Sequence, residues 1–522
     1  MSQTLIEALQ NPALYNHPTS EFRLYQTHIS WVLLTGDYAY KIKKPMDFGF
    51  LNFTTLEKRR FFCEQEVRLN QRLAPEIYLD VLPISGTESE PRLGDDSAPF
   101  EYAVRMKQFD AERLLSNLQA ESGLNQDHID VMAEQIAQFH QRINKADSST
   151  VLGDADQVML PVQQNFDQVR ALLTKKTALA QLEQLEGWAQ DTFTRLRPLF
   201  ERRKQEGMIR ECHGDIHLGN VALIGDQVTL FDCIEFNDEF RWIDVISEVA
   251  FLVMDLESRG EQALARHFIN HYLELTGDYE GIQLLSFYKS YRAMVRAKVS
   301  RFMLGDPSLS DEARANLEAD YQRYIDLAEA YTVFKHPFML ITNGVSGSGK
   351  SWISRAVIKE LGVIRIRSDV ERKRLFGLEA NADSHSELEQ GIYTPEATEK
   401  TYQRLAELAG FVIQSATPVI IDATNLKLWQ REALREKAEQ LAVPVLILSF
   451  TASEETLRRR VLKRHAKGDD ASEADVAVLE KQLQQQETIS AEEASYTVTI
   501  NTDEDNASQR LLDSIRRNFG LQ

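Results

Sequence analysis

The chain has 522 residues, of which 43% are hydrophobic and 26% are charged, so it can bury the cores of about three soluble globular domains. No stretch approaches the roughly 18 consecutive apolar residues of a membrane span, and residues 1–7 do not show the basic and then apolar pattern of a secretory signal. We therefore expect a cytoplasmic protein that does not span a membrane.

The net charge of −20 should repel nucleic acid over most of the surface, although a local basic groove could still bind it. The three cysteines, Cys63, Cys212 and Cys233, are too few for a disulfide framework. Cys212 and Cys233 could lie close together, and we expect them to be small buried apolar residues and not a redox pair.

The N-terminal part of the chain shows the pattern of a mixed helix and strand unit. Residues 1–30 look like a helix followed by a polar connection. Residues 28–34 and 38–44 are rich in β-branched and aromatic residues and flank the turn Thr35-Gly36-Asp37. This arrangement predicts a hairpin, which ends at Pro45.

A helix and two further strands should complete this unit. Apolar spacing predicts the helix over residues 56–73. The strands are expected over residues 76–84 and 100–107. The interval 85–99, which is rich in Gly, Ser, Pro and acidic residues, should be a flexible loop.

Helices should dominate the next part of the chain. An amphipathic helix is predicted over residues 127–144, in which His140 is a structural residue. Residues 160–205 are charged and poor in glycine, as is typical of helices, and residues 311–333 should form a last long helix. His336-Pro337 then marks a domain boundary.

One predicted helix, over residues 288–299, carries a basic stripe. Lys289, Arg292 and Arg296 share one face through their i, i+3 and i+4 spacing. A solvated helix face is the simplest account of this stripe.

The segment His213-Gly214-Asp215-Ile216-His217-Leu218-Gly219-Asn220 reads H-x-D-x-x-x-x-N, and a short strand after it ends on Asp232. Phosphoryl transfer needs a carboxylate that accepts the proton of the attacking hydroxyl, together with an amide and a second carboxylate that hold Mg²⁺ on the phosphates. We therefore assign Asp215 as the base, and Asn220 and Asp232 as metal ligands. The alternative, a polar turn before a hairpin, does not explain the spacing and the downstream aspartate together.

This segment resembles the catalytic loop of aminoglycoside phosphotransferases and of the related choline, homoserine and fructosamine kinases, which share the protein-kinase-like fold. His213, Asp215 and Asn220 match the loop motif, and Asp232 matches the metal aspartate. Asp244 matches the later aspartate that usually braces the loop. The resemblance implies an α+β bilobal domain that binds ATP.

The resemblance also implies a lysine that holds the α- and β-phosphates. Ala39-Tyr40-Lys41 resembles the V-A-I-K pattern, which favours Lys41. Lys43 points to the same face of the strand and is the alternative, and a solvent-facing basic strand is the simpler account of both. The following helix should carry the acid that pairs with the lysine, and Glu66 is favoured over Glu64.

Two further expectations follow from the same resemblance. Backbone groups of residues 107–109 should form the hinge that reads the adenine, although the glycine-rich loop of protein kinases is absent from the sequence. The sharper hypothesis for Arg292 and Arg296 is that they line the acceptor cleft and bind an acidic or phosphorylated substrate. Aminoglycosides are polycations and would need acidic residues there instead.

A second nucleotide site is indicated further along the chain. The buried-strand pattern of residues 338–342 leads directly into G-x-x-x-x-G-K-S and then a helix, which is the required context for a P-loop. In a P-loop the backbone N–H groups wrap the phosphates, the lysine reaches the β- and γ-phosphates and the serine binds Mg²⁺. The predicted nucleotide-binding residues are Gly344, Val345, Ser346, Gly347, Ser348, Gly349, Lys350 and Ser351.

The strands expected after the P-loop are residues 364–367, 419–425, 445–450 and 496–500. Their order resembles small P-loop kinases, such as polynucleotide kinases, zeta-toxin-like kinases and gluconate kinase. In that resemblance Asp369 is the acceptor-side base, Arg372 helps to bind the acceptor, and Asp422 and Asn425 form a D-x-T-N turn.

The same resemblance assigns a catalytic role to two arginines. Arg460 and Arg464, four residues apart on a helix, match the lid arginines that clamp the transferring phosphoryl group, with Lys350 on its other side. A solvated basic helix over residues 458–464 is the alternative.

Together the resemblances cover nearly the whole chain, whose order of domains is similar to that of the bacterial bifunctional aminoglycoside phosphotransferase/ATP-binding proteins. They imply a kinase-like N-lobe at residues 1–110, a C-lobe at 111–334, and an α/β P-loop NTPase domain with a parallel sheet at 335–522.

The leading hypothesis is an Mg²⁺-dependent kinase with two ATP sites, each of which transfers the γ-phosphoryl group to a hydroxyl of a small-molecule acceptor. One alternative is a nucleotide-sensing regulator, in which one ATP site gates the other. Another is phosphorylation of the 5′-hydroxyl of nucleic acid by the C-terminal domain. The sequence does not give the acceptor of either half or the oligomeric state.

Overall fold

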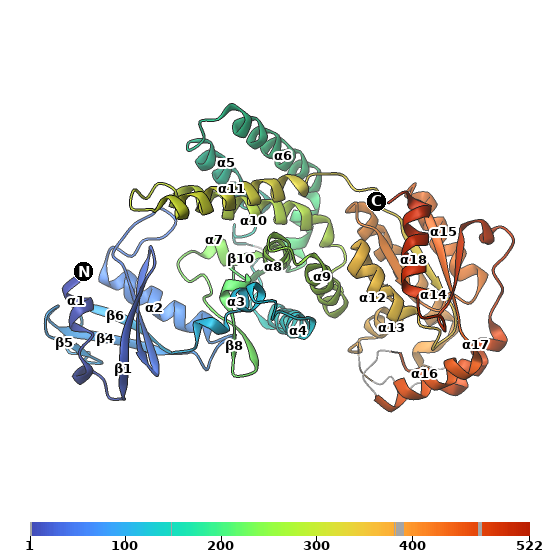
Figure 1. Cartoon of the computed structure of the whole chain (residues 1–522), viewed down its shortest axis with the longest axis horizontal. Coiled ribbons are helices and arrows are strands. Elements are labelled where there is room, and N and C mark those ends of the chain that lie inside the picture. The colour runs from blue at the N-terminus through green and yellow to red at the C-terminus, as the bar shows by residue number, and fades with distance from the viewer. Residues whose placement is uncertain (1–2, 148, 381, 383–390, 468–471, 522) are drawn as a thin grey trace. The chain divides into compact units, whose positions relative to one another are not determined.

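The computed structural model describes residues 3–521 except 148, 381, 383–390 and 468–471. The chain divides into two compact units, Met1–Leu256 with Tyr291–Ile325, and Glu257–Ser290 with Asp326–Gln522 (Figure 1). The division of the sequence at residues 110 and 334 stays a prediction. No helix in the described part of the chain is both long and apolar enough to cross a bilayer.

The first unit opens with a six-stranded antiparallel sheet in the order β1-β2-β3-β6-β4-β5. Helix α1 (Gln3–Ala8) buries Leu5 and Ile6 against this sheet, and α2 (Leu56–Asn70) packs on β4 and β6. The strands are β1 (Thr19–Gln26), β2 (Ser30–Gly36), β3 (Tyr38–Lys43), β4 (Tyr78–Gly86), β5 (Pro91–Leu93) and β6 (Glu101–Lys107).

The predicted hairpin, helix and two further strands of this unit are confirmed, but two strands were not expected. β1 replaces part of the polar connection, and its side chains are mostly exposed because it lies at the edge of the sheet. Without a buried face it lacks the alternation of apolar and polar residues that predicts a strand. β5 pairs with β4 within the interval expected to be a loop.

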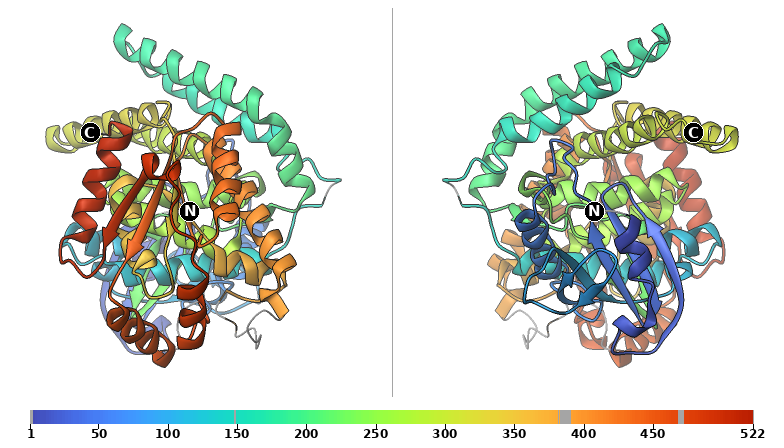
Figure 2. Two further views of the ribbon diagram at one scale, coloured as in Figure 1. Left: turned by 90° about the vertical axis from the view of Figure 1, so that its right-hand side faces the viewer. Right: turned by 90° about the vertical axis from the view of Figure 1, so that its left-hand side faces the viewer.

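The rest of the first unit is mainly helical, as predicted. Helices α5 and α6 run side by side, as Figure 2 shows. Two small sheets, β7 with β10 and β8 with β9, carry the loops of the candidate site. The elements are α3 (Leu115–Ala120), α4 (Gln126–Arg142), α5 (Ala155–Arg170), α6 (Lys176–Gln205), β7 (Ile209–Glu211), β8 (Val221–Ile224), β9 (Gln227–Leu230), α7 (Asp238–Arg241), β10 (Trp242–Asp244), α8 (Val245–Ser258), α10 (Ile282–Met303) and α11 (Asp311–Ala330). Residues 257–258, 282–290 and 326–330 of the last three helices belong to the second unit.

The second unit contains a five-stranded parallel sheet in the order β12-β13-β11-β14-β15, which confirms the predicted α/β class. The strands are β11 (Met339–Asn343), β12 (Ile364–Arg367), β13 (Val419–Asp422), β14 (Val445–Thr451) and β15 (Thr497–Asn501). The helices between and after them are α12 (Lys350–Leu361), α13 (Ser368–Leu375), α14 (Pro395–Gln414), α15 (Leu428–Gln440), α16 (Glu454–Lys467), α17 (Val476–Gln485) and α18 (Ala507–Phe519).

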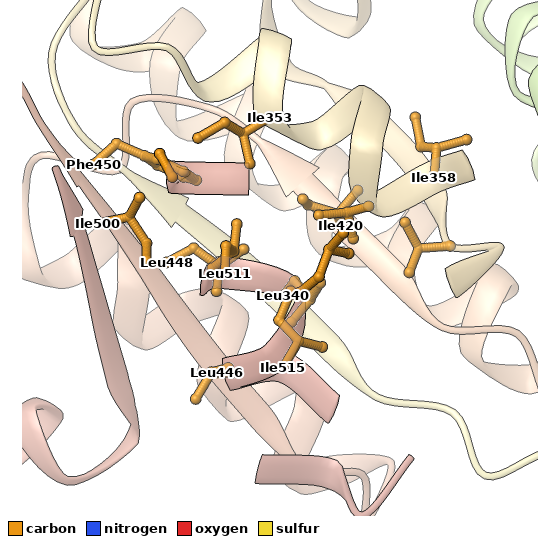
Figure 3. Close-up of a cluster of buried hydrophobic side chains, with 14 of the residues drawn as sticks. Leu340, Ile353, Ile358, Ile420, Leu446, Leu448, Phe450, Ile500, Leu511 and Ile515 are labelled. Atoms are coloured by element: carbon orange, nitrogen blue, oxygen red, sulfur yellow. The ribbon is translucent and has the colours of Figure 1, made fainter. Parts of the chain in front are cut away.

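The core of this unit forms between one face of the sheet and two helices (Figure 3). Leu340 and Leu448 project from central strands toward Ile353 of α12 and toward Leu511 and Ile515 of α18. These side chains are fully buried. Because the central strands β11, β13 and β14 are largely apolar, they match the pattern of a parallel sheet covered on both faces. The edge strands β12 and β15 also carry polar residues.

Helix α9 (Gln262–Thr276) belongs to the second unit, although it precedes α10 in the chain. It packs against α12 and β12. The side-chain oxygen of Asn270 accepts a hydrogen bond from Arg365 N at 2.7 Å, and its amide nitrogen donates to Val363 O at 3.1 Å. The helix therefore satisfies backbone groups on the outer side of β12.

Ion pairs strengthen the same contact. The Glu274 carboxylate lies 2.8 Å from Arg365 and 2.9 Å from Arg367. Burial raises the pKa of Glu274, but the two guanidinium groups outweigh it and lower this pKa to about 2. Because β12 leads directly to Asp369, Glu274 holds the strand that positions this predicted base.

Glu274→Gln should lower the free energy of unfolding of the second unit by about 3 kcal/mol, since it leaves two largely buried guanidinium groups without their carboxylate. In the wild type the pKa of this carboxyl is about 2 in the folded state and 4.5 in the unfolded reference. The stabilisation is therefore complete above pH 4.5 and is lost as the pH falls toward 2.

Hydrogen–deuterium exchange of the β11 and β12 peptides between pH 3 and pH 6 measures this effect. The exposed acid Glu360, changed to Gln, is the matched control and should leave exchange unchanged. An equal response of the two variants to pH would contradict the assigned role of Glu274.

Candidate active sites

The catalytic-loop residues lie between β7 and β8 and end in a 3-10 turn, Leu218–Asn220. The amide nitrogen of Asn220 donates to the carbonyl oxygen and to Oδ2 of Asp215, at 3.0 Å each. His217 Nε2 lies 3.5 Å from the same carboxylate oxygen. The structure therefore brings together the predicted base and one predicted metal ligand, and it directs the amide oxygen of Asn220 away from Asp215.

The Asp215 carboxyl stays ionised in this environment. Burial raises its pKa, but His217, His213 and Arg296 outweigh burial and lower the pKa to about 2. A carboxylate of such low pKa orients the attacking hydroxyl and receives its proton only as the new bond to phosphorus forms.

Asp232 follows β9 and has a φ angle of 64°, in the left-handed region that residues with a side chain rarely adopt. Phe231 N donates to Asn220 O at 3.0 Å, so the two loops are joined and Asn220 and Asp232 lie close together. Their amide and carboxylate oxygens are the hard ligands that Mg²⁺ prefers. These two residues therefore fit the predicted metal.

Two lysines of β3 share one carboxylate of α2. Glu66 Oε1 lies 2.7 Å from Lys41 Nζ, and Glu66 Oε2 lies 2.6 Å from Lys43 Nζ. Lys41 also contacts Asp232 at 2.9 Å, whereas Lys43 contacts Glu235. Lys41 is thus the lysine beside the predicted metal ligand, and Lys43 lies deeper.

The charges of this cluster compensate one another. Burial lowers the pKa of Lys41, but Asp232 and Glu66 outweigh it and hold the pKa well above its usual range. Burial raises the pKa of Glu66, but Lys41 and Lys43 outweigh it and bring the pKa to about 2. The alternative acid, Glu64, pairs with Arg60 at the surface and does not reach either lysine.

Glu248 of α8 braces the catalytic loop, and the sequence had pointed to Asp244 for this role. Glu248 Oε1 accepts a hydrogen bond from Gly214 N at 2.6 Å, and Glu248 Oε2 lies 2.7 Å from His140 Nε2. Asp244 instead accepts two hydrogen bonds from Arg203, at 2.7 and 2.8 Å. The prediction for Asp244 is therefore wrong, while His140 has a structural place, as expected.

A second acid of α8 contacts the same loop. Asp255 Oδ2 accepts a hydrogen bond from Leu218 N at 2.9 Å. Glu248 and Asp255 are seven residues apart and hence on one face of the helix. Each lies in an otherwise apolar run in which residues 245–256 are all buried. An acidic residue within such an apolar run is the sequence signal for this brace. A buried charge requires a partner, and here the partner is the catalytic loop.

His140, Cys212 and Glu248 also place their potential ligand atoms within 4.8 Å of one another. Two of the three are already hydrogen-bonded to each other, and Glu248 also binds the loop. This cluster therefore acts as a brace between α4, α8 and the catalytic loop.

The two arginines predicted to bind the acceptor have different surroundings. Arg292 is 5% exposed and donates to Gly214 O at 3.2 Å and to Ser247 Oγ at 3.3 Å. It therefore helps to hold the loop. Arg296 lies one turn further along α10, and its charge contributes to the lowered pKa of Asp215. Its contact with an acceptor stays a prediction.

The expected hinge has fewer backbone donors than predicted. Lys107 N donates to Ile77 O at 2.8 Å, and Gln108 N donates to Asp37 O at 3.0 Å. Two of the groups assigned to adenine are therefore already hydrogen-bonded within the sheet region.

The predicted P-loop joins β11 to α12, as required. Gly344 and Gly347 have φ angles of 146° and 81°, and an added Cβ would lie 2.7 Å from Phe450 O or 2.8 Å from Leu457 O. Only glycine fits these positions. The Lys350 ammonium group donates to Gly344 O at 2.8 Å and Val345 O at 2.9 Å, and so folds back on its own loop.

Three acidic or amide groups surround this lysine at the ends of strands. Burial lowers the pKa of Lys350 to about 8, although Asp422 and Asp369 act in the opposite direction. Within the described residues, Asp422 Oδ2 and Asn425 Oδ1 are buried without a hydrogen-bond donor. Together with Ser351 at the start of α12, they form an oxygen-rich site of the kind that suits Mg²⁺ and phosphate.

Asp369 lies in the first turn of α13, where β12 ends. Arg372, one turn later, is 8% exposed and donates to Ile392 O at 2.9 Å and to Thr398 Oγ1 at 3.2 Å. Its guanidinium also stacks over the Tyr393 ring, 5.2 Å from the centroid. The contacts of Arg372 are thus structural, and its contact with an acceptor stays a prediction.

The lid arginines of α16 lie at the P-loop. Arg460 donates to Gly347 O at 3.2 Å and to Thr502 Oγ1 at 2.8 Å. Arg464 donates to Ala474 O at 2.9 Å and contributes to the lowered pKa of Lys350. By contrast, Arg458 pairs with Glu480 at the surface. Arg460 therefore contacts the predicted phosphate-binding loop, whereas a contact of Arg464 with the phosphoryl group stays a prediction.

Comparison with known proteins gives matches to both halves of the chain. Residues 61–285 match the family model described as "Phosphotransferase enzyme family", and residues 339–489 match the model described as "AAA domain". Uncharacterized proteins of Mycobacterium tuberculosis and Mycobacterium bovis are each 30% identical to this chain over 476 residues, which cover 89% of the chain and 91% of the relative.

Similar solved structures cover one half each. Amicoumacin kinase hAmiN, in complex with AMP-PNP, Ca²⁺ and Ami, is 10% identical and covers 62% of this chain and 94% of its own, with a TM-score of 0.41. A gluconokinase from Sinorhizobium meliloti 1021 is 22% identical and covers 35% of this chain and 98% of its own, with a TM-score of 0.25.

Binding of a triphosphate at the P-loop should be linked to proton uptake by Lys350. Its pKa of about 8 means that the lysine is mostly charged at pH 7 and mostly neutral at pH 9. Phosphate binds the charged form, so we expect uptake of close to one proton at pH 9 and an affinity that falls roughly tenfold per pH unit above 8. Lys41 should not contribute, because its pKa is raised.

Titration calorimetry of ATP in two buffers with different heats of ionisation measures this uptake. Lys350→Arg is the control, because a guanidinium stays charged and should abolish the pH dependence. Equal uptake in that variant would contradict the assignment to Lys350.

The two lysines of β3 should have different roles, one in stability and the other in ATP binding. Lys43→Met should lower stability by about 3 kcal/mol, because Glu235 is left buried without its partner. Lys41→Met should lower ATP affinity with a smaller loss of stability, since Asp232 is partly exposed.

Urea unfolding and ATP titration of the two variants measure both effects. Combining Lys43→Met with Glu235→Gln should recover much of the stability, because it also removes the buried charge. Equal loss of stability in the two single variants would overturn this division of roles.

Proposed function

Because this chain belongs to the family of bifunctional aminoglycoside phosphotransferase/ATP-binding proteins, in which a phosphotransferase domain precedes a P-loop kinase domain, we propose that it is a kinase with two ATP sites. Each site transfers the γ-phosphoryl group of ATP to a hydroxyl of a small-molecule acceptor. The observation that carries this proposal is the contact of Asp215 with Asn220 and of Asp232 with Lys41, on two loops that a hydrogen bond joins.

The residues of the first site have distinct roles in this reaction. Lys41 exchanges Asp232 for the ATP phosphates and keeps Glu66 as its partner. Asn220 and Asp232 would hold Mg²⁺, which would neutralise the charge of the phosphates. Asp215 orients the acceptor hydroxyl and takes its proton. Glu248 and Asp255 fix the loop that carries Asp215.

The second site uses a different set of groups for the same task. The P-loop amides and Lys350 bind the phosphates after the lysine leaves the carbonyl oxygens of its own loop. Ser351 and Asp422 would hold Mg²⁺. Asp369 takes the proton of the acceptor, and Arg460 and Arg464 stabilise the charge on the transferring group.

One observation favours a sensing role for the second site as a second candidate. Ser346 N, one of the P-loop amides, donates to the side-chain oxygen of Gln482 at 2.7 Å. Together with the folded-back Lys350, this contact closes the loop on itself. ATP would have to displace Gln482, so binding at this site would move α17 and could serve as a signal.

Mass spectrometry of a pooled metabolite extract tests the proposed kinase activity. The wild type is expected to produce new phosphorylated species with ATP and Mg²⁺. Asp215→Ala should remove the products of the first site, and Lys350→Ala those of the second, by at least a hundredfold. The surface variant Glu64→Gln is the control and should retain all products. ATP binding without any product in the wild type would favour the sensing role.

A further inference from the structure

We propose that the first site takes an acceptor that carries an anionic group, a phosphate or a carboxylate, and that Arg296 binds this group next to the reacting hydroxyl. The transfer step rests on the proposed function, whereas the binding step does not. The inference separates Arg296 from Arg292, since the contacts of the two arginines differ.

The position of Arg296 follows from the contact made by its neighbour on α10. Arg292 donates to Gly214 O, directly before Asp215 in the chain. Arg296 lies four residues later on the same face of the helix, which is about 6 Å along its axis. Its charge is felt at the base, because it contributes to the lowered pKa of Asp215. Arg296 therefore borders the space in front of the carboxylate that receives the acceptor.

The guanidinium of Arg296 is held in place from one side by an aromatic ring. It lies over Tyr324 of α11, 5.7 Å from the ring centroid, and Tyr324 is itself buried. Figure 1 shows α11 alongside α10. Arg296 also has a side-chain hydrogen-bond interaction with Tyr324. Because a guanidinium has five N–H donors, others remain for a planar or tetrahedral anion.

Arg296 has no carboxylate within 4 Å in the described part of the chain, although it is only partly exposed. Two arginines of this unit with little exposure form such pairs, Arg59 with Glu101 and Arg203 with Asp244, each at 2.9 Å or less. Arg292 instead donates to a carbonyl and a hydroxyl oxygen of the protein. A guanidinium removed from water is normally paired. At Arg296 the missing partner fits a ligand that arrives with its own negative charge.

The negative charges around the site explain why an anionic acceptor would need an arginine to bind there. Burial lowers the pKa of Arg296, but Tyr324, Asp255 and Asp215 outweigh it and raise the pKa. An anionic acceptor must approach both the Asp215 carboxylate and the phosphates of ATP, which repel it. Arg296 offsets this repulsion at the place where the acceptor must bind, whereas a cationic acceptor would be repelled by Arg296 itself.

Binding of small hydroxylated probes tests the proposal. We would titrate the Lys350→Ala protein, in the presence of ADP and Mg²⁺, with glycerol 2-phosphate and glycerate as anionic probes, glycerol as a neutral probe and ethanolamine as a cationic probe. At least one anionic probe should bind, and Arg296→Gln should weaken it tenfold or more. Arg296→Lys should recover part of the affinity, because it keeps the charge but not the planar fork.

Arg323→Gln is the matched control. Arg323 stacks on the same Tyr324 ring, at 5.0 Å, but pairs with Asp320 and is about half exposed. This variant should change the affinity for the anionic probe less than twofold.

The possible outcomes are distinct. Absence of saturable binding by both anionic probes would overturn the proposal. Equal weakening of the affinities for the anionic and the neutral probe by Arg296→Gln would also overturn it, because the arginine would then act only through Asp215. Binding that depends on Arg296 but is never followed by phosphoryl transfer when ATP replaces ADP would leave this inference standing and refute the proposed kinase activity.

Discussion

Sharing of the Glu66 carboxylate between two lysines is the interaction on which the first site depends. Each oxygen of Glu66 holds one ammonium group, so two charged side chains of β3 can be buried on one acid of α2. The lysines then extend the cluster to Asp232 and Glu235, which lie on the loop after β9. A single network of charges thus fixes the sheet, the helix and the metal-binding loop against one another. Removal of Lys43 leaves Glu235 as a buried charge without its partner, and removal of Glu66 takes from both lysines the carboxylate they share.

The lysine proposed to bind phosphate is hydrogen-bonded to protein oxygens in both sites. Lys41 contacts Asp232, and Lys350 contacts the carbonyl groups of its own P-loop. On nucleotide binding, each lysine would exchange protein oxygens for phosphate oxygens. Neither ammonium group would have to stay without a hydrogen-bond acceptor. The environments still differ, since carboxylates hold the pKa of Lys41 high while burial lowers that of Lys350. The two sites should thus respond differently to pH even though they bind the same phosphates.

Residues that belong to short motifs could be predicted from the sequence, because their spacing is set by the backbone of one loop. Asp215, Asn220 and the P-loop residues are of this kind, and the parallel sheet follows from its apolar strands. The brace by Glu248 could not be read from spacing, since α8 packs on the catalytic loop from a distant part of the chain. The choice between Lys41 and Lys43 was equally open, because both point to one face of β3 and only their partners distinguish them. Strand β1 was missed because it has almost no buried face.

The position of α9 has a consequence for how this protein can be divided. In the described structure, β12 is the outermost strand of the parallel sheet, and Asn270 and Glu274 of α9 cover its open side. A fragment cut at the match of the P-loop family model, residues 339–489, lacks this helix. Its exposed strand would offer unpaired backbone groups to other chains and invite aggregation. The two units therefore cannot be separated by a single cut of the chain. A gene that lost the first half would also lose α9, which the second unit needs to remain monodisperse.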